Sequence, residues 1–264
     1  MPDISSILIL CINLPAATER RAAVEEQARR LGLEVQFVEA VAGKDLPENP
    51  PAYDRKGRAK IYTYDLSPNE IACTLSHIKA METFLASGAD YAVIMEDDIV
   101  FADNIKKGLH ELIHDLHGWE AAKIYTADDA GRLYDLGDKG KHVSAVFPRK
   151  VIWGAVAWLY TRKAVEQLLP EMQPVFHAAD AQIGQTLLRK QIPTIGVYPR
   201  LIATSDPNTE HSTIDTADTP RIICGRRRSL LQYLRYRLSV IRTAQGKKRM
   251  IRLMRRRLNR AQAH

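Results

Sequence analysis

The stretch YAVIMEDDIVF (residues 91–101) places three carboxylates in the middle of an apolar run. The residues before them, YAVIM, have the apolar and β-branched character of a buried strand. Because an unpaired buried charge is costly, Glu96, Asp97 and Asp98 need a reason to follow such a strand. At the carboxyl end of a parallel strand they would face the crevice in which open α/β sheets bind ligands. The stretch therefore predicts an α/β fold with an acidic site at one edge of its sheet.

The three acids divide between two sides of the chain. Side chains alternate along an extended backbone, which puts Glu96 and Asp98 on one side and Asp97 on the other. Two oxygen ligands that converge on a cleft suit Mg²⁺ or Mn²⁺, and such an ion can bridge to a diphosphate. A strand that ends in a solvated acidic turn has the same spacing, so the spacing alone leaves both interpretations open.

The segments before this strand predict a Rossmann-like half-domain. ILILCINL (residues 7–14) is typical of a strand buried on both faces, and residues 35–41 predict a second strand. A helix is expected between them, capped by Thr18 and closed by Gly32. This strand–helix–strand order favours a parallel sheet.

A Pro- and Gly-rich region at residues 43–69 predicts a long loop of the kind that is usually functional or disordered. Ser67 then predicts the start of a helix, with Pro68 at its first position and Glu70 completing a capping box. Further strands are expected at 92–95, 122–126, 142–147 and 194–198, helices at 162–169 and 180–190, and a loop at 127–141.

The charge is distributed unevenly along the 264 residues, a length that suits one large α/β domain or a domain with an appendage. Residues 219–264 hold 15 of the 38 Lys and Arg and none of the 31 Asp and Glu. The remaining chain is therefore acidic, and the basic segment is expected to meet a polyanion. We divide the chain into a domain at 1–220 and a basic helical tail at 221–264.

The tail predicts basic amphipathic helices. Leu230, Leu234, Leu238 and Ile241 recur at helical spacing among arginines, and the stretch around Met254 repeats the pattern. Such helices lie in a membrane interface, where each Lys or Arg near an anionic surface contributes about 1 kcal/mol. An arginine-rich helix can also bind nucleic acid, but the interleaved apolar residues favour a membrane surface or a partner helix.

The cysteines and the hydropathy predict a cytoplasmic protein. Cys11, Cys73 and Cys224 are far apart and form no metal-binding pair, as in a reducing compartment. No signal peptide is recognised at the N-terminus, where Asp3 replaces the basic region. The apolar run at 151–160 is about half of the roughly 20 residues that a membrane span needs.

Five short motifs together resemble glycosyltransferase family 25, which includes bacterial lipooligosaccharide galactosyltransferases and collagen galactosyltransferases. They are INL (12–14), the pair Arg20 and Arg21, AVAG (40–43), LSH (75–77) and MEDD (95–98). Their order and spacing match from residue 7 to about residue 214. The resemblance implies a GT-A type fold, a Rossmann-like mixed sheet flanked by helices, which uses a nucleotide-sugar donor and a divalent metal. The EDD sequence would then play the part of the DxD motif.

The resemblance assigns roles to residues of the N-terminal half. Asp98 would bind Mn²⁺ or Mg²⁺, and Glu96 would contact the metal shell or the donor ribose. Asn13 and Arg20 would hold the uridine diphosphate, although a solvated helix-face charge is the simpler interpretation of Arg20 alone. Gly43 would admit the nucleotide close to the backbone, a use of a residue without Cβ.

Other assignments remain open between two interpretations. His77 would lie near the site, either in contact with substrate or in a structural hydrogen bond. Asp180 is the first candidate for the base that takes the acceptor's proton, or for a residue that holds the acceptor sugar, or it is a plain helix N-cap. Asp129 is its rival for the base. His211 would complete the metal shell, and its imidazole suits Mn²⁺ better than Mg²⁺.

The resemblance thus predicts a transferase that moves a hexose, galactose from UDP-galactose, with inversion onto a lipooligosaccharide or lipopolysaccharide acceptor. Such an enzyme would sit at the cytoplasmic face of the inner membrane, held by the basic tail. Two alternatives are a transferase that uses another donor such as UDP-glucose, and a non-catalytic relative that binds membranes or nucleic acid. A P-loop phosphotransferase is disfavoured, since the chain has no Gly-x4-Gly-Lys-Ser/Thr sequence.

Overall fold

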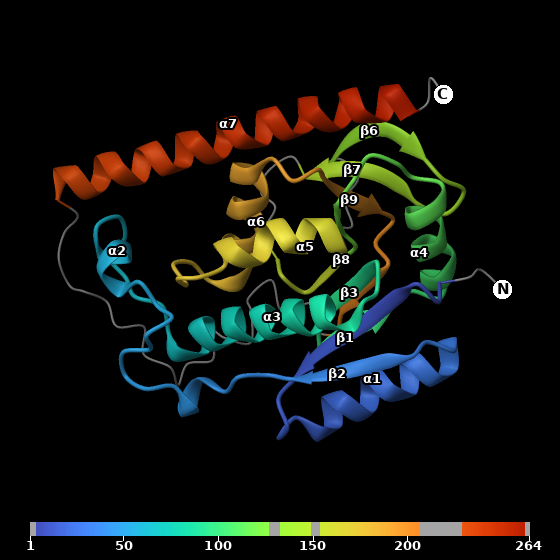
Figure 1. The fold of residues 1–264 in the computed structure, drawn as a ribbon, viewed down its shortest axis with the longest axis horizontal. Coiled ribbons are helices and arrows are strands. Elements are labelled where there is room, and N and C mark those ends of the chain that lie inside the picture. The colour runs from blue at the N-terminus through green and yellow to red at the C-terminus, as the bar shows by residue number, and fades with distance from the viewer. Residues whose placement is uncertain (1–3, 127–132, 149–153, 206–228, 262–264) are drawn as a thin grey trace.

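The computed structural model describes residues 4–126, 133–148, 154–205 and 229–261. Their centre is an eight-stranded mixed sheet with the order β2-β1-β3-β8-β5-β9-β7-β6, and a two-stranded sheet pairs β10 with β4. Helices flank the large sheet (Figure 1). The predicted GT-A type α/β class, with a Rossmann-like mixed sheet and a C-terminal helix, is confirmed.

The N-terminal half is parallel, as its apolar runs predict. β1 (Ile7–Asn13) pairs in parallel with both β2 (Val35–Glu39) and β3 (Tyr91–Glu96). β1 is buried along almost its whole length because neighbours cover both of its faces. The connecting helix α1 (Thr18–Leu31) ends at Gly32, whose φ of 61° is left-handed. Its N-cap is Ala17 rather than the expected Thr18.

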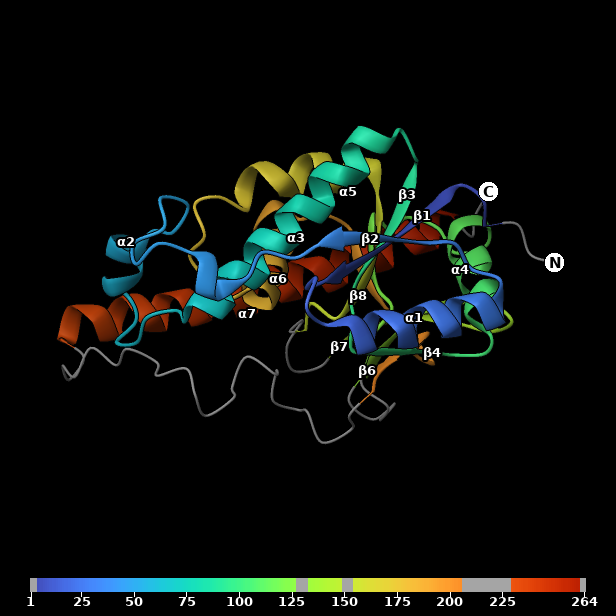
Figure 2. The same cartoon turned by 90° about the horizontal axis from the view of Figure 1, so that it is seen from below.

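The helix α3 (Pro68–Ser87) begins where the sequence predicts. Ser67 accepts a hydrogen bond from the Glu70 amide, and the Glu70 side chain bonds back, so the capping box is confirmed. Figure 2 shows α3 and α5 (Arg162–Leu168) on one side of β1 and β2, with α1 on the other. The region before α3 holds two short helices, η1 (Gly43–Asp45) and α2 (Arg55–Ala59).

The second half of the sheet reverses direction. β8 (Ala157–Thr161) lies antiparallel between β3 and β5 (Ala121–Lys123). The remaining strands are β9 (Thr194–Tyr198), β7 (Ser144–Pro148) and β6 (Leu133–Lys139). Two expectations need correction: β5 stops at Lys123, before the predicted residue 126, and β6 occupies part of the predicted loop at 127–141.

Smaller elements complete the body. α6 (Ala179–Lys190) packs against α3 and α5, and η3 (Leu169–Glu171) follows α5 directly. α4 (Ile105–His114) follows β4 (Ile99–Phe101), which pairs antiparallel with β10 (Ile202–Thr204).

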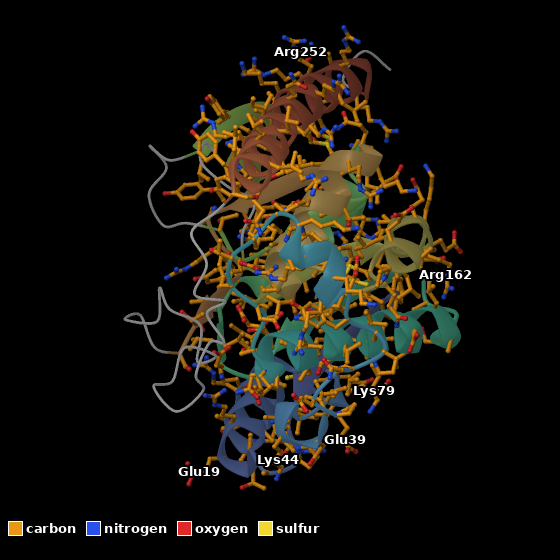
Figure 3. All side chains as sticks on the ribbon, turned by 90° about the vertical axis from the view of Figure 1, so that its left-hand side faces the viewer. Glu19, Glu39, Lys44, Lys79, Arg162 and Arg252 are labelled. Atoms are coloured by element: carbon orange, nitrogen blue, oxygen red, sulfur yellow. The ribbon has the colours of Figure 1, made fainter. Side chains whose placement is uncertain are left out.

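The tail forms one helix, α7 (Leu230–Ala261), which runs along the body from α2 to β6 (Figure 1). Its second half belongs to the core, since Met250, Met254 and Leu258 are at most 1% exposed. Arg249, Arg252, Arg255 and Arg256 of this half are exposed, as Figure 3 shows for Arg252, whereas Arg257 pairs with Glu120 of the body at 3.4 Å. In the described segments, no helix combines the length and apolarity that a membrane crossing requires. The division at residue 220 stays a prediction.

Candidate functional site

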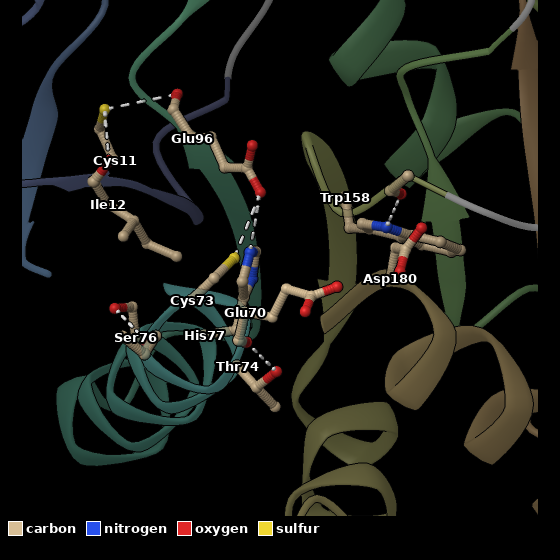
Figure 4. A network of polar contacts seen from close by, with 12 residues as sticks. Cys11, Ile12, Glu70, Cys73, Thr74, Ser76, His77, Glu96, Trp158 and Asp180 are labelled. Atoms are coloured by element: carbon tan, nitrogen blue, oxygen red, sulfur yellow. Dashed lines mark hydrogen bonds and ion pairs between the residues drawn. The ribbon is translucent and has the colours of Figure 1, made fainter. Parts of the chain in front are cut away.

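The candidate site lies where several strands end together. β1 ends at Asn13, β3 at Glu96 and β5 at Lys123. β8 is antiparallel to both β3 and β5, so the carboxyl ends of all three strands share one edge of the sheet. α3 and α6 bring further side chains toward this edge, as Figure 4 shows for His77 and Asp180.

Asp97 is already paired within the protein. Its Oδ2 accepts a hydrogen bond from Asn13 Nδ2 at 2.8 Å, and its Oδ1 lies 3.2 Å from Arg20 Nη1. The two residues expected to hold uridine diphosphate therefore both contact a carboxylate of the EDD sequence. They remain in the site region, because Asn13 ends β1 and Arg20 lies in the first turn of α1.

Asp98, unlike Asp97, has a carboxylate oxygen that is left without a partner in the described part of the chain. Its Oδ1 is buried and has no hydrogen-bond partner among the residues described. Burial, followed by the negative charge of Glu96, raises the pKa of this carboxyl to about 6. An orphaned buried carboxylate oxygen is costly, and a cation removes that cost. Asp98 thus fits the divalent metal that a GT-A type donor site implies.

The side chain of Glu96 points to α3, away from the side on which Asp97 contacts Asn13 and Arg20, in agreement with the predicted alternation. Its Oε1 lies 3.3 Å from His77 Nε2 and 3.9 Å from Cys73 Sγ (Figure 4). His77 is only 1% exposed, so α3 holds its ring rigidly against the end of β3. His77 therefore lies beside the end of β3 in contact with Glu96, and its role at a donor site stays a prediction.

Asp180 comes from α6 and lies in the right half of Figure 4, apart from Glu96 and His77. The N-cap of α6 is Ala178, so the N-cap interpretation of Asp180 is wrong. Its Oδ1 accepts the Ala181 amide at 2.6 Å, and burial raises its pKa. The charges of Lys123 and Glu96 both act on this carboxyl, which places all three in one electrostatic environment.

Lys123 lies at the candidate site, although the sequence pattern predicts it only as part of a strand. It is 6% exposed, and burial lowers the pKa of its ammonium to about 8 against the opposing effect of Asp180. Its Nζ would lie 3.1 Å from a Cβ on Gly154, a glycine with φ of 101°. The signal was available, because a lysine inside the apolar run AAKIY is unusual for a buried strand.

Gly43 allows a close approach between its own backbone and the first turn of α3. A Cβ here would come within 2.8 Å of Asn69 N and Pro68 C, so the missing side chain lets the first turn of α3 pack. Its expected contact with the nucleotide stays a prediction. Asp129 and His211, the rival base and the proposed third metal ligand, lie outside the described residues.

The comparison with known families agrees with this arrangement. A sequence profile described as "Glycosyltransferase family 25 (LPS biosynthesis protein)" matches residues 7–183, from β1 into α6. This range covers well over half of the chain and contains every described residue of the site. The chain belongs to glycosyltransferase family 25.

Individual family 25 relatives are distant. "Probable inactive glycosyltransferase 25 family member 3" of Rattus norvegicus is 29% identical over 115 residues, 41% of this chain and 20% of that protein. A "Glycosyltransferase 25 family member" of Aedes aegypti is 28% identical over 124 residues, 42% of this chain and 20% of the relative. The matches thus span about a fifth of these relatives.

A bacterial relative is nearer in length. "Lacto-N-neotetraose biosynthesis glycosyltransferase LgtB" of Neisseria meningitidis is 32% identical over 100 residues, 38% of this chain and 36% of that protein. Among solved structures, a glycosyltransferase involved in glycosylation of the major capsid of PBCV-1 has a TM-score of 0.38. It shows 13% identity, with 72% of this chain and 81% of that chain covered.

Proposed function

We propose that this chain is a metal-dependent glycosyltransferase that moves a hexose, galactose from UDP-galactose, onto a lipooligosaccharide or lipopolysaccharide acceptor with inversion. The observation that carries the proposal is the orphaned Oδ1 of Asp98 at the carboxyl edge of the sheet, beside Glu96. A buried carboxylate oxygen without a partner lowers the stability of the fold, as is expected of a group that serves binding rather than stability.

Asp98 and Glu96 would hold Mn²⁺ or Mg²⁺, with His211 as the proposed third ligand. When bound, the ion supplies positive charge for the leaving diphosphate. Asn13 and Arg20 would orient the uridine diphosphate from β1 and α1, and Arg20 is exposed enough, at 45% of its side chain, to exchange partners. Gly43 and His77 would border the donor.

Asp180 would take the proton of the attacking acceptor hydroxyl on its carboxylate. Its raised pKa makes it a stronger base than a solvated aspartate, and the positive charge of Lys123 opposes part of the rise. Asp129 stays the second candidate for this role.

Two alternatives remain in the proposal. UDP-glucose or another nucleotide sugar could be the donor, since nothing in the site geometry selects galactose. A non-catalytic chain is the second, because the rat and mouse relatives are named inactive. The intact Glu96 and Asp98 favour catalysis.

A panel of UDP-sugars tests the proposal without knowledge of the acceptor, since such transferases can release donor slowly to water. We expect UDP release from UDP-galactose only when Mn²⁺ or Mg²⁺ is present, measured by a coupled UDP assay. A preference for UDP-glucose would move the proposal to its first alternative. Absence of both turnover and metal-dependent UDP binding would overturn it in favour of a non-catalytic chain.

We further propose that the first half of α7 holds the protein on an anionic membrane surface. Here the helix turns its polar residues toward the body: Gln232 Nε2 donates to Ala59 O at 2.8 Å, and Tyr236 meets the Tyr62 ring edge-on. Its apolar residues face outward and are 46–75% exposed: Leu230, Leu231, Tyr233, Leu234, Leu238, Val240 and Ile241. Exposed arginines stand among them, at positions 235, 237 and 242.

Vesicle binding should therefore depend on both charge and apolar surface. We expect the protein to co-sediment with phosphatidylglycerol vesicles and not with phosphatidylcholine vesicles. The double substitution R235Q and R237Q should weaken binding about 30-fold, because each arginine contributes about 1 kcal/mol. Gln245→Ser, an exposed polar change on the same helix, is the matched control. Equal binding to both vesicles, or binding to RNA alone, would contradict the proposal.

A further inference from the structure

Three side chains of different chemistry meet at the inner end of the candidate site. Cys73 and His77 lie four residues apart on α3, one turn above each other on the same face. Glu96, at the end of β3, faces both of them (Figure 4). The Sγ, the imidazole nitrogen and the carboxylate oxygen all lie within 4.8 Å of one another, the one such group found in the described part of the chain.

Two of the three spacings among these atoms are close to those of a tetrahedral zinc site. Zinc bonds of roughly 2.0–2.3 Å at tetrahedral angles put neighbouring ligand atoms about 3.3–3.7 Å apart. Here Glu96 Oε1 is 3.3 Å from His77 Nε2 and 3.9 Å from Cys73 Sγ. The third pair, Cys73 Sγ and His77 Nε2, lies within 4.8 Å, so the side chains would draw together around the ion, and three protein ligands leave the fourth position open.

The contacts among the three groups are weak without a cation. Both donors share the single oxygen Glu96 Oε1, and 3.3 Å is long for a hydrogen bond. A Cys73 thiolate 3.9 Å from the Glu96 carboxylate would be repelled by that negative charge if no cation stood between them. A divalent cation reverses this effect, because it stabilises the thiolate and neutralises the carboxylate together.

We propose that Cys73 Sγ, His77 Nε2 and Glu96 Oε1 bind a borderline-soft divalent cation of the Zn²⁺ class. The mixed sulfur, nitrogen and oxygen set selects Zn²⁺ over Mg²⁺ and Mn²⁺, because a thiolate is a soft ligand and the two harder ions prefer oxygen. The zinc site stands on its own geometry and does not depend on the proposed transfer reaction.

One consequence does rest on the proposed function. Glu96 is shared by the zinc site and the proposed donor metal site, and its carboxylate cannot serve both ions fully. Zn²⁺ is thus expected to inhibit a Mn²⁺-dependent release of UDP, and Cys73→Ser should relieve that inhibition.

Cobalt substitution tests the site by absorption, with no need for activity. Addition of Co²⁺ to the reduced, metal-free protein should produce tetrahedral d–d bands in the visible and a thiolate-to-cobalt charge-transfer band in the near ultraviolet. Both should saturate at one equivalent of Co²⁺. Zn²⁺ should displace both. Cys73→Ser should abolish the charge-transfer band, and His77→Gln should weaken Co²⁺ binding at least tenfold.

The controls separate this site from the others. Cys11→Ser removes a fully buried thiol whose Sγ lies against backbone oxygens of Ile12 and Glu96, and it should leave the spectrum unchanged. Asp98→Asn should also keep the charge-transfer band, although it disables the proposed donor metal site. If Cys73→Ser does not fold, Glu96→Gln serves as the second variant and should weaken Co²⁺ binding. Weak octahedral bands without charge transfer, or a charge-transfer band that survives in Cys73→Ser, would overturn the proposal.

Discussion

Asp98→Asn should abolish metal-dependent UDP binding while it makes the metal-free protein more stable. The first effect follows because a metal ligand is removed, and we expect at least a 100-fold loss of affinity for UDP in the presence of Mn²⁺. The second follows because asparagine carries no charge into the position where Oδ1 of Asp98 is buried. Isothermal titration calorimetry and urea unfolding in EDTA measure the two effects.

The stability change has a defined pH dependence. Burial and the Glu96 charge raise the folded-state pKa of Asp98 from 3.8 to about 6. Because this folded pKa lies above the unfolded value, ionised Asp98 destabilises the fold at neutral pH, and that cost disappears as the pH falls through 6 toward 4. A shift of two pKa units corresponds to about 3 kcal/mol at most. We therefore expect Asp98→Asn to raise the free energy of unfolding by about 1–3 kcal/mol at pH 7 and by little near pH 4.

Asp103→Asn is the matched control. The Asp103 carboxylate is 88% exposed and lies 3.5 Å from Arg30, an exposed pair of the kind that contributes about 1 kcal/mol or less. Neither UDP binding nor the pH profile should change in this variant. An Asp98→Asn protein that unfolds more easily at pH 7, or that still binds UDP with Mn²⁺, would contradict the assignment of Asp98 as a metal ligand.

Local patterns in the sequence were sufficient for the N-terminal half of the site. The apolar run of β1, the capping box of α3 and the strand that ends at Glu96 are all set by neighbouring residues, so their positions could be predicted. The alternation of Glu96 and Asp97 also holds, with Glu96 against α3 and Asp97 against Asn13.

Long-range pairing is what the sequence did not reveal. β8 inserts antiparallel between β3 and β5, and its register with β3 joins residues more than 60 positions apart. Lys123 reaches the site only because β5 is placed by β8 and β9, so its role could not be inferred from its neighbours in the chain. Cys73 lies in the helix of the LSH motif, yet only the meeting of α3 with β3 shows what it contacts.

The tail also shows what the sequence could not predict. Both of its stretches repeat apolar residues at helical spacing, and the sequence treats them alike. In the structure the second stretch is docked, since its Met250, Met254 and Leu258 are buried, whereas the apolar residues of the first stretch face outward. Periodicity shows that a face exists and does not show what covers it.

Met254→Ala should therefore destabilise the protein strongly. Met254 has no exposed surface and packs in the core with Met250 and Leu258. Removal of a buried methionine side chain leaves a cavity and costs about 2–5 kcal/mol. Urea unfolding followed by circular dichroism should show a lower midpoint with an unchanged slope if the native fold is retained.

Leu238→Ala separates the two halves of α7. Leu238 is 51% exposed, so its truncation removes little buried surface and should change stability by less than about 0.5 kcal/mol. The same change should weaken vesicle binding, because it removes outward apolar surface from the proposed membrane face. Met254→Ala should leave vesicle binding intact at temperatures where the protein remains folded. A large stability loss from Leu238→Ala, or none from Met254→Ala, would mean that α7 is docked through its other half and that the membrane proposal has assigned the wrong surface.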